Sequence, residues 1–337
     1  MPVPNARFFE LLQDIEPSST TKSNASGGHI GIRDHLRTQA KFKDRYVSSF
    51  LSGSYARDTS IRPRTSSDGQ ERPDVDIIIV TNFTTDDHPD AVLKEVCHAL
   101  EDGGEGYEVE RVNKRSVRVE NWQADMDVVP VIQTWDGYQI ADRDSGTWKF
   151  TNPPVHTSWS SEQNDWFGKR FKALVKLFKW WRRINPSGRR PKGFILEVLV
   201  GLHGPTMEAH YGEAFAQLLA NIYAAYGVLA SIDQKPFIAD PAVPSNDILG
   251  KVTVAQWKDF IEKVRVYADI ARRAQDAEDM EEATRQWRRV FGDRFKATAN
   301  VAKASAYGGF AAAAAPAAGY TFPNAMAAPS NKPRGFA

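Results

Sequence analysis

The chain has 337 residues, which suggests two domains at roughly 100–200 residues per domain. Its 43 Lys and Arg residues nearly balance its 42 Asp and Glu residues, which argues against a surface that binds nucleic acid by bulk charge, although a local basic patch fits the same total. The single cysteine, Cys97, excludes an internal disulfide and a cysteine zinc cluster and fits a reducing cytoplasm. The sequence predicts no signal peptide and no membrane span.

The first half of the chain mixes helices with strands. Spaced apolar residues predict helices, β-branched or alternating runs predict strands, and stretches rich in Ser, Thr and Gly predict loops. In chain order these patterns predict a short helix around Phe8–Ile15, a loop at 18–28, a helix at 30–46, a strand at 47–51, a loop at 59–73, a strand at 76–80, a helix at 89–101, and strands at 107–112, 116–120 and 125–132.

The second half is mostly helical. The helices predicted there are 165–184, 193–202, 213–232, 254–274 and 276–291. From about residue 304 the composition changes to Ala, Gly and Pro, which cannot bury enough apolar surface to offset chain entropy, so a flexible tail is predicted. We therefore expect an α+β fold with three parts, at 1–155, 156–303 and 304–337.

Three aspartates precede runs of β-branched residues in two predicted strands. Asp74 and Asp76 are two residues apart, so both side chains point to one face of their strand. Asp127 opens a later strand in the same way, and Asp125 is the alternative third carboxylate. Charges at the edge of a buried strand are costly unless they are paired or bind a metal. Oxygen ligands favour a hard cation such as Mg²⁺, although an isolated Asp-x-Asp is more often a turn residue beside a salt-bridged carboxylate.

Gly53 and Ser54 follow the strand that ends at Leu51. A glycine permits a tight turn that brings backbone N–H groups close to a phosphate, and a serine adds a hydroxyl donor. Alone, this dipeptide predicts only a turn. It gains weight because it stands 20 residues before the first aspartate (74 − 54 = 20).

Together these motifs resemble a known superfamily. Residues 53–62 (Gly-Ser-Tyr-Ala-Arg-Asp-Thr-Ser-Ile-Arg), 74–77 (Asp-Val-Asp-Ile) and 126–130 (Met-Asp-Val-Val-Pro) resemble the polymerase-β-type nucleotidyltransferases. The resemblance is strongest to the bacterial cGAS/DncV-like nucleotidyltransferases (CD-NTases) of CBASS anti-phage operons, and it runs from about residue 45 to about residue 300. It implies a palm whose mixed sheet carries the carboxylates, and a helical lobe that closes the nucleotide cleft.

The resemblance also implies a cytoplasmic bacterial enzyme that makes a cyclic di- or trinucleotide from ATP, with GTP and other NTPs as further candidate substrates. It implies that Asp74, Asp76 and Asp127 hold two Mg²⁺ ions, with Mn²⁺ as an alternative, and that Gly53 and Ser54 contact the triphosphate. The alternatives are a linear nucleotidyltransferase acting on RNA or protein, and a catalytically silent nucleotide-sensing scaffold. The near-neutral charge weakens the RNA alternative, and the three carboxylates argue against the scaffold.

The helix predicted at 165–184 is basic and aromatic. One face carries Phe171, Leu174, Val175, Phe178 and Trp181, which predicts a core-facing stripe. Another face carries Lys172, Lys176, Lys179 and Arg183, which predicts either a solvated basic face or a phosphate contact. By resemblance, Lys176 is the candidate for the triphosphate. Relatives often carry Ser-Tyr where this chain has Gly193-Phe194, so the serine contact is lost, and Phe194 either stacks on a base or packs in the core.

The chain ends in Pro-Arg-Gly-Phe-Ala, with Ala337 last. Some operons of this family encode ubiquitin-transfer-like enzymes that join the C-terminus of the synthase to a target. The resemblance therefore makes Ala337 a candidate conjugation site and such an enzyme a candidate partner, with an inert tail as the alternative. The histidines show no ligand spacing and no long basic stretch is present, so neither a zinc module nor activation by DNA is predicted.

Overall fold

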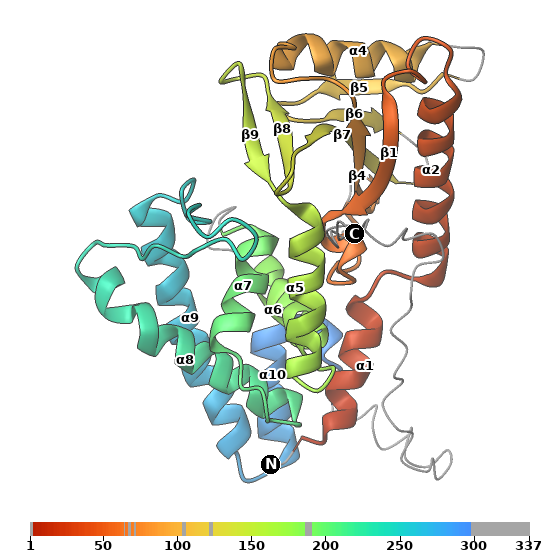
Figure 1. The fold of residues 1–337 in the computed structure, drawn as a ribbon. Helices are drawn as coiled ribbons and strands as arrows, with labels where there is room; N and C mark the ends of the chain where they lie inside the picture. Colours follow the sequence, from red (N-terminus) through yellow and green to blue (C-terminus); the bar gives the residue numbers. More distant parts are fainter. Residues whose placement is uncertain are drawn as a thin grey trace, which may run out of the picture. The chain divides into compact units, whose positions relative to one another are not determined.

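The computed structural model describes residues 3–63, 65–66, 69–70, 72–102, 106–120, 124–185 and 191–297 (Figure 1). By their contacts these residues form two units. The sheet unit contains residues 17–57 and 63–158, and the helical unit contains residues 3–16, 58–62 and 159–297. Both units are discontinuous in sequence, since the chain enters the helical unit three times.

The sheet unit is built on a seven-stranded sheet with the order β1-β4-β7-β6-β5, extended by β8 beside β7 and β9 beside β8. Its strands are β1 (Tyr46–Ser52), β4 (Asp74–Thr81), β5 (Val109–Val112), β6 (Val117–Glu120), β7 (Asp125–Gln133), β8 (Tyr138–Asp142) and β9 (Thr147–Thr151). Only the pairing of β4 with β7 is parallel among the described strands of this sheet. The sheet is therefore mixed, as the sequence predicts. β2 (Thr65–Ser66) and β3 (Gly69–Gln70) form a separate ribbon.

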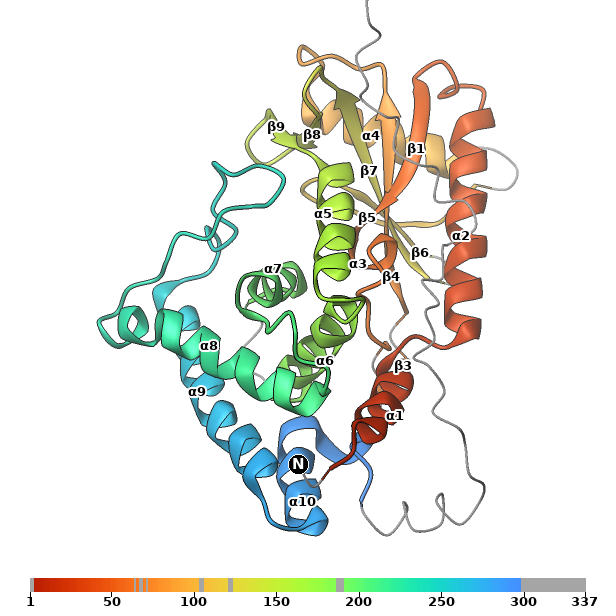
Figure 2. The same cartoon turned by 60° about the horizontal axis from the view of Figure 1, so that its bottom comes forward.

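Two helices cover one face of this sheet. α2 (Ser19–Thr38) runs beside β1, and α4 (Pro89–Glu101) packs on the same side (Figure 2). Their apolar residues share one buried cluster with Ile77 and Val128. Because side chains alternate along a strand, the neighbouring residues Asp76 and Asp127 point to the opposite face.

The loop predicted at 18–28 is wrong, since these residues form the first half of α2. Ser18 caps the helix by accepting a hydrogen bond from the backbone N–H of Thr21, at 3.1 Å. Ala25 is fully buried against the sheet. Ser, Thr and Gly are weak helix formers, but tertiary packing of one face overrides that preference. Gly31 is required for this packing, because a Cβ there would lie 2.8 Å from the Tyr107 hydroxyl.

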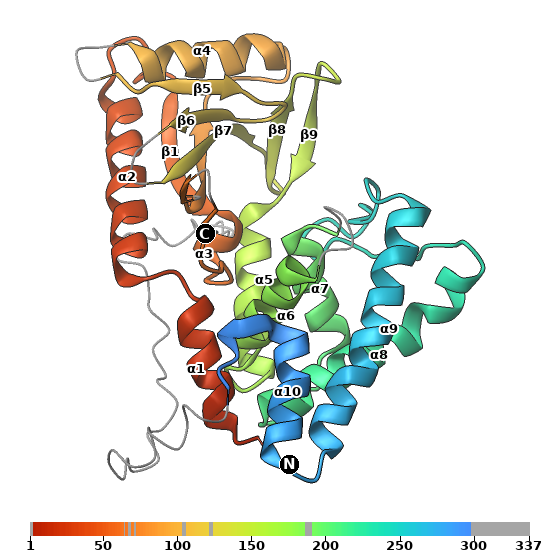
Figure 3. The same ribbon diagram turned by 180° about the vertical axis from the view of Figure 1, so that it is seen from behind.

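The helical unit consists of α1 and the helices that follow β9. Its helices are α1 (Asn5–Ile15), α6 (Phe171–Ile184), α7 (Gly193–His203), α8 (Tyr211–Ser231), α9 (Val254–Asp276), α10 (Met280–Phe291) and the 3-10 turn η1 (Gly292–Arg294), together with most of α5 (Pro153–Trp166). α9 packs against both α8 and α10 (Figure 3). Phe8 of α1 makes an edge-to-face contact with Trp287 of α10, with ring centroids 5.1 Å apart. The first helix of the chain therefore completes the core of the last ones.

The helices α6 and α8 of this unit differ in part from the helices predicted from the sequence. The helix predicted at 165–184 is two helices, because Gly168 and Lys169 adopt positive φ angles and break it. The apolar stripe of α6 is buried as predicted. α8 is long and apolar enough to span a membrane by length and composition, and Phe215 and Ile222 on it are fully buried in the helical core.

Candidate active site

The parallel pairing of β4 with β7 brings the predicted carboxylates together. Asp74 lies opposite Asp125, and Asp76 lies opposite Asp127. Alternate residues of a strand share a face, so all four carboxylates lie on the sheet face that α2 and α4 leave uncovered. Exposure decreases along this row, from 61% for the Asp74 side chain to 12% for that of Asp127. The four acids therefore form a row that runs from solvent into the sheet.

Gly53 fits against the second of these carboxylates. It follows β1 with a φ of +71° and opens the short helix α3 (Gly53–Ala56). A Cβ at this position would lie 1.8 Å from Oδ2 of Asp76, so no other residue fits without moving the carboxylate. The glycine of the Gly-Ser motif thus meets two demands at once, a left-handed backbone and a close approach to Asp76. Ser54 follows in the same turn.

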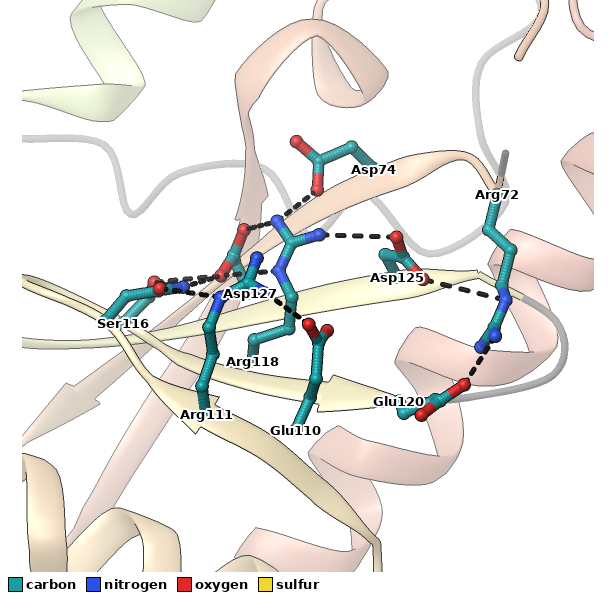
Figure 4. A network of polar contacts seen from close by, with 10 residues as sticks. Arg72, Asp74, Glu110, Arg111, Ser116, Arg118, Glu120, Asp125 and Asp127 are labelled. Carbon is teal, nitrogen blue, oxygen red and sulfur yellow. Dashed lines mark hydrogen bonds and ion pairs between the residues drawn. The ribbon is translucent and has the colours of Figure 1, made fainter. Parts of the chain in front are cut away.

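One arginine joins three of the four carboxylates. Arg118 lies on β6, directly opposite Asp127. Its Nη2 donates to Oδ1 of Asp74 at 2.8 Å and also to Oδ2 of Asp127, and its Nη1 donates to Oδ2 of Asp125 at 3.3 Å (Figure 4). The other oxygen of Asp127, Oδ1, accepts from the Ser116 hydroxyl at 2.8 Å. Arg118 is the central cation of this row.

Burial and charge shift the protonation of these groups. Burial raises the pKa of Asp76 to about 7, and the charges of Asp74 and Asp127 act in the same direction. Burial alone would lower the pKa of Arg118, but its hydrogen bond to Asp127 and the neighbouring negative charges outweigh that effect and raise it. The row therefore favours a bound cation and resists full ionisation without one.

The donor set suits a hard divalent cation, because every candidate ligand is a carboxylate oxygen on one face of two neighbouring strands. The guanidinium of Arg118 shows that a cation is already stabilised there. As the side chains stand, no three His, Cys, Asp or Glu groups converge as a finished metal cage anywhere in the described ranges. In this arrangement three of the carboxylates pair with Arg118 instead.

Comparison with known proteins identifies the family. Residues 1–164 match the family model described as the Second Messenger Oligonucleotide or Dinucleotide Synthetase domain. A cyclic AMP-AMP-AMP synthase from an Acinetobacter species is 45% identical over 335 residues, which span 98% of this chain and 97% of that protein. The chain belongs to the CD-NTase family. It is a nucleotidyltransferase that makes a cyclic oligonucleotide, and enzymes of this superfamily are generally metal-dependent.

More distant relatives agree with this assignment. A cyclic AMP-AMP-GMP synthase from Enterobacter hormaechei is 26% identical, over 86% of this CD-NTase and 91% of the relative. Among solved structures, the CD-NTase CdnG from Bradyrhizobium diazoefficiens, in complex with GTP, has a TM-score of 0.70 at 17% identity, covering 90% of this chain and 98% of that one. At that identity the likeness shows the fold, and it confirms the α+β architecture expected from the sequence.

Two of the four residues on the basic face of α6 in this CD-NTase are buried. Lys176 is buried, and its Nζ donates to Glu16 at 2.8 Å and to Asp58 at 3.3 Å. Lys179 is also buried, and its Nζ donates to Oε1 of Glu197 at 2.6 Å. The prediction of a solvated face is therefore wrong for these two lysines, because acidic groups distant in sequence neutralise them inside the helical unit.

Residues 193 and 194 also lie in the helical unit. Phe194 is partly buried and packs against the helical core, which favours the core alternative over base stacking. A Cβ on Gly193 would lie 3.3 Å from Cε of Lys179, so a serine there would crowd the buried lysine. This contact gives a local reason for glycine at the position where relatives often have serine. Ala337 lies outside the described residues.

Sequence patterns did not predict the residues that surround Asp127, namely Arg118, Ser116 and Asn113. Asn113 donates to Oδ1 of Asp127 at 3.2 Å. The signal was present in the alternating strands at 107–112 and 116–120, since an antiparallel register between the second of these and β7 places an arginine opposite the aspartate.

Proposed function

We propose that this CD-NTase joins three adenylates from ATP into a cyclic trinucleotide. The observation that carries the proposal is the 45% identity to a cyclic AMP-AMP-AMP synthase over nearly the full length of both chains. GTP is the second candidate substrate, because the relative at 26% identity is named a cyclic AMP-AMP-GMP synthase. We further propose that the product serves as a second messenger in CBASS anti-phage signalling and that the enzyme works in the bacterial cytoplasm.

We assign Asp74, Asp76 and Asp127 as the carboxylates that hold two Mg²⁺ ions, with Mn²⁺ as a substitute. Bound there, such ions would activate the attacking ribose hydroxyl and stabilise the charge that develops on the transferred phosphate. Asp127 is placed beside that hydroxyl, since it lies deepest in the row and Ser116 holds one of its oxygens at 2.8 Å. The support for this assignment is the shared face and in-register pairing of the three carboxylates.

The nucleotide contacts are proposed from the same geometry. Gly53 brings the backbone of α3 up to Asp76, so its N–H and the Ser54 hydroxyl are candidates for the triphosphate. Lys176 remains a candidate as well, but it would have to exchange Glu16 or Asp58 for a phosphate. Phe194 is the weakest of these, because it packs against the helical core.

The test of the catalytic proposal is an incubation with Mg²⁺ and radiolabelled ATP, GTP, CTP and UTP, omitting each in turn, followed by phosphatase. We expect ATP alone to give a phosphatase-resistant product that co-migrates with cyclic AMP-AMP-AMP. A requirement for GTP would redirect the product to a mixed ring. Complete loss of label to phosphatase, in the presence of nucleotide consumption, would contradict ring closure and favour a linear product.

We also propose that an operon-encoded ubiquitin-transfer-like enzyme acts on Ala337. The support is the family resemblance of the synthase and the Ala/Gly/Pro-rich composition of residues 304–337. Co-expression of the full chain with that enzyme should give conjugates on an immunoblot. A chain lacking Ala337 should give none while keeping its synthase activity, and conjugates that persist without Ala337 would refute the proposal.

A further inference from the structure

Arg118 is fixed in its position among the carboxylates. It lies between Val117 and Val119 on β6, and both valines are fully buried on the face that α4 covers. Its own side chain must therefore point to the face of the aspartates, where it is 14% exposed. The backbone of Arg118 is held in β6, so any cation that enters this face meets a guanidinium already there.

The contacts of Arg118 overlap with those a metal needs. Nη2 donates to Oδ1 of Asp74 and to Oδ2 of Asp127, which are two of the three carboxylates assigned to the metal (Figure 4). A divalent ion of this size binds carboxylate oxygens at about 2.0–2.1 Å, well inside the distance at which a guanidinium N–H binds them. An ion bound to Oδ1 of Asp74 or to Oδ2 of Asp127 would compete with Nη2 for the lone pairs of that oxygen and would be repelled by the guanidinium charge.

Asp125 provides the guanidinium with a second anchor. It lies opposite Asp74 in the register of β4 and β7, and its Oδ2 accepts from Nη1 of Arg118 at 3.3 Å. Asp125 belongs to the same row but is not needed for a metal site made from the other three. A guanidinium presents its donors as a planar fork, so Arg118 can keep Asp125 while it releases the others.

We propose that Arg118 is a built-in counter-cation that occupies the metal-binding face of Asp74 and Asp127 in the metal-free enzyme and retreats to Asp125 when a divalent ion binds. The inference rests on the proposed metal site and deepens it. In this arrangement Arg118 is a positioning residue that sets how much divalent cation is needed to fill the site. It also stabilises the empty site, because carboxylates this close repel one another without a cation between them.

Arg118 has opposite effects on the stability of the metal-free protein and on its affinity for metal, and this distinguishes the proposal from a purely structural role. Removing the guanidinium should destabilise the metal-free protein and, in the same variant, strengthen metal binding. Removal of a residue that merely held the carboxylates in place would lower both the stability of the metal-free protein and its affinity for metal. The most direct probe is Mn²⁺ alone, without nucleotide, followed by electron paramagnetic resonance of free Mn²⁺ and by thermal unfolding of the full chain.

For Arg118→Gln we expect a lower melting temperature in EDTA and a half-saturating Mn²⁺ concentration lowered by about tenfold. Asp125→Asn should have the reverse effect on Mn²⁺, raising the half-saturating concentration, because Arg118 then has no second anchor. Arg72→Gln is the matched control, since Arg72 also lies near Asp125, at 3.8 Å, and is not among the groups bonded to Asp74 or Asp127 in Figure 4. It should change Mn²⁺ binding by less than about twofold.

Unchanged or weaker Mn²⁺ binding in a folded Arg118→Gln protein would overturn the proposal. If that variant does not fold, Arg118→Lys takes its place. A lysine keeps the charge but lacks the fork, so it cannot hold Asp125 while it releases the other carboxylates, and Mn²⁺ binding should weaken as in Asp125→Asn. Tighter binding in the lysine variant would then overturn the proposal. Absence of Mn²⁺ binding in the wild-type chain would instead refute the metal site of the proposed function. If Asp76→Asn abolishes the Mn²⁺ binding seen in the wild-type chain but substitution of Arg118 leaves it unchanged, only the role of Arg118 is refuted.

Discussion

Each unit of this CD-NTase holds a cation among acidic groups, but the charges balance differently. In the helical unit Lys179 meets one carboxylate, Glu197, whose side chain is 0% exposed, and its remaining donors reach the carbonyl and hydroxyl of Thr59. In the sheet unit Arg118 faces Asp74, Asp125 and Asp127 at once, with Asp76 in the same row. The first cluster pairs a buried lysine with a buried carboxylate. The second keeps an excess of negative charge, which a divalent cation can meet.

This contrast teaches how to separate a structural ion pair from a functional one. A buried pair with matched charges and satisfied donors stabilises one arrangement and offers nothing to a ligand. A row of carboxylates with too few cations is destabilising in isolation, and natural chains retain such rows at functional sites. Four experiments test this difference between the two clusters.

The largest effect is expected from Asp76→Asn. Replacing the carboxylate by an amide removes a metal ligand, so synthesis of the cyclic product should fall at least about 100-fold and Mn²⁺ should no longer raise the melting temperature. The metal-free protein should become more stable at pH 8, because the ionised Asp76 is costly there. Asp136→Asn, in the turn after β7, is the control and should behave as wild type. Full activity in the Asp76 variant would remove this residue from the site.

The second effect concerns the buried pair of Lys179 and Glu197. Lys179→Met leaves Glu197 buried without its cation, so the free energy of unfolding should drop by roughly 3–5 kcal/mol in urea titrations. Lys258→Met, which breaks the exposed pair with Asp233, should cost less than about 1 kcal/mol. A double replacement with Glu197→Leu should recover part of the loss. Equal costs for the buried and exposed pairs would contradict the distinction between them.

A third pair of substitutions, at Gly53 and Gly146, separates the cost of backbone strain from the loss of room beside Asp76. Gly53→Ala and Gly146→Ala both place a side chain at positive φ, +71° and +62°, and each should cost roughly 1–3 kcal/mol of stability. Only at residue 53 would the new Cβ overlap Asp76, since at residue 146 the nearest atom is Nε2 of His88 at 3.4 Å. Mn²⁺ binding should therefore weaken in the first variant and stay unchanged in the second. Isothermal titration with Mn²⁺ checks this, and equal binding in both would contradict it.

The smallest effect is a dependence on pH. The pKa of Asp76 is about 7 in the folded metal-free protein, against about 3.9 for an unperturbed aspartate. The folded chain thus binds an extra proton between these values, so this group favours folding at low pH and the benefit is lost as the pH rises through about 7. Mn²⁺ must displace the same proton, so its affinity should rise about fivefold from pH 6 to pH 7, about tenfold from pH 6 to pH 8, and level off above pH 8. Asp76→Asn should flatten this profile.

Much of this site follows from local sequence patterns. The alternation of Asp74 and Asp76 at the edge of an apolar strand predicts two carboxylates on one face, and the Gly-Ser break predicts a turn at residue 53. Both depend only on neighbours in the chain. The long amphipathic helices of the second half are predictable for the same reason, because their period is visible within a few turns.

Other features depend on partners distant in sequence and could not be predicted in this way. Lys176 looks like part of a solvated face until Glu16 and Asp58 are placed beside it. The hairpin of β8 and β9 has short strands of mixed polarity and was not predicted, because its stability comes from pairing with β7. The role of Arg118 can be inferred only from the strand register, which places it opposite Asp127. In each case tertiary contacts decide what the local pattern leaves open.

The discontinuous helical unit has a consequence for folding during synthesis. Phe8 packs on Trp287, so α1 is synthesised long before the helix α10 that completes its core. The sheet unit, contained within residues 17–158, can close much earlier. The nascent chain should therefore carry a finished sheet beside an exposed α1, whose apolar face makes it a natural client for chaperones until translation ends.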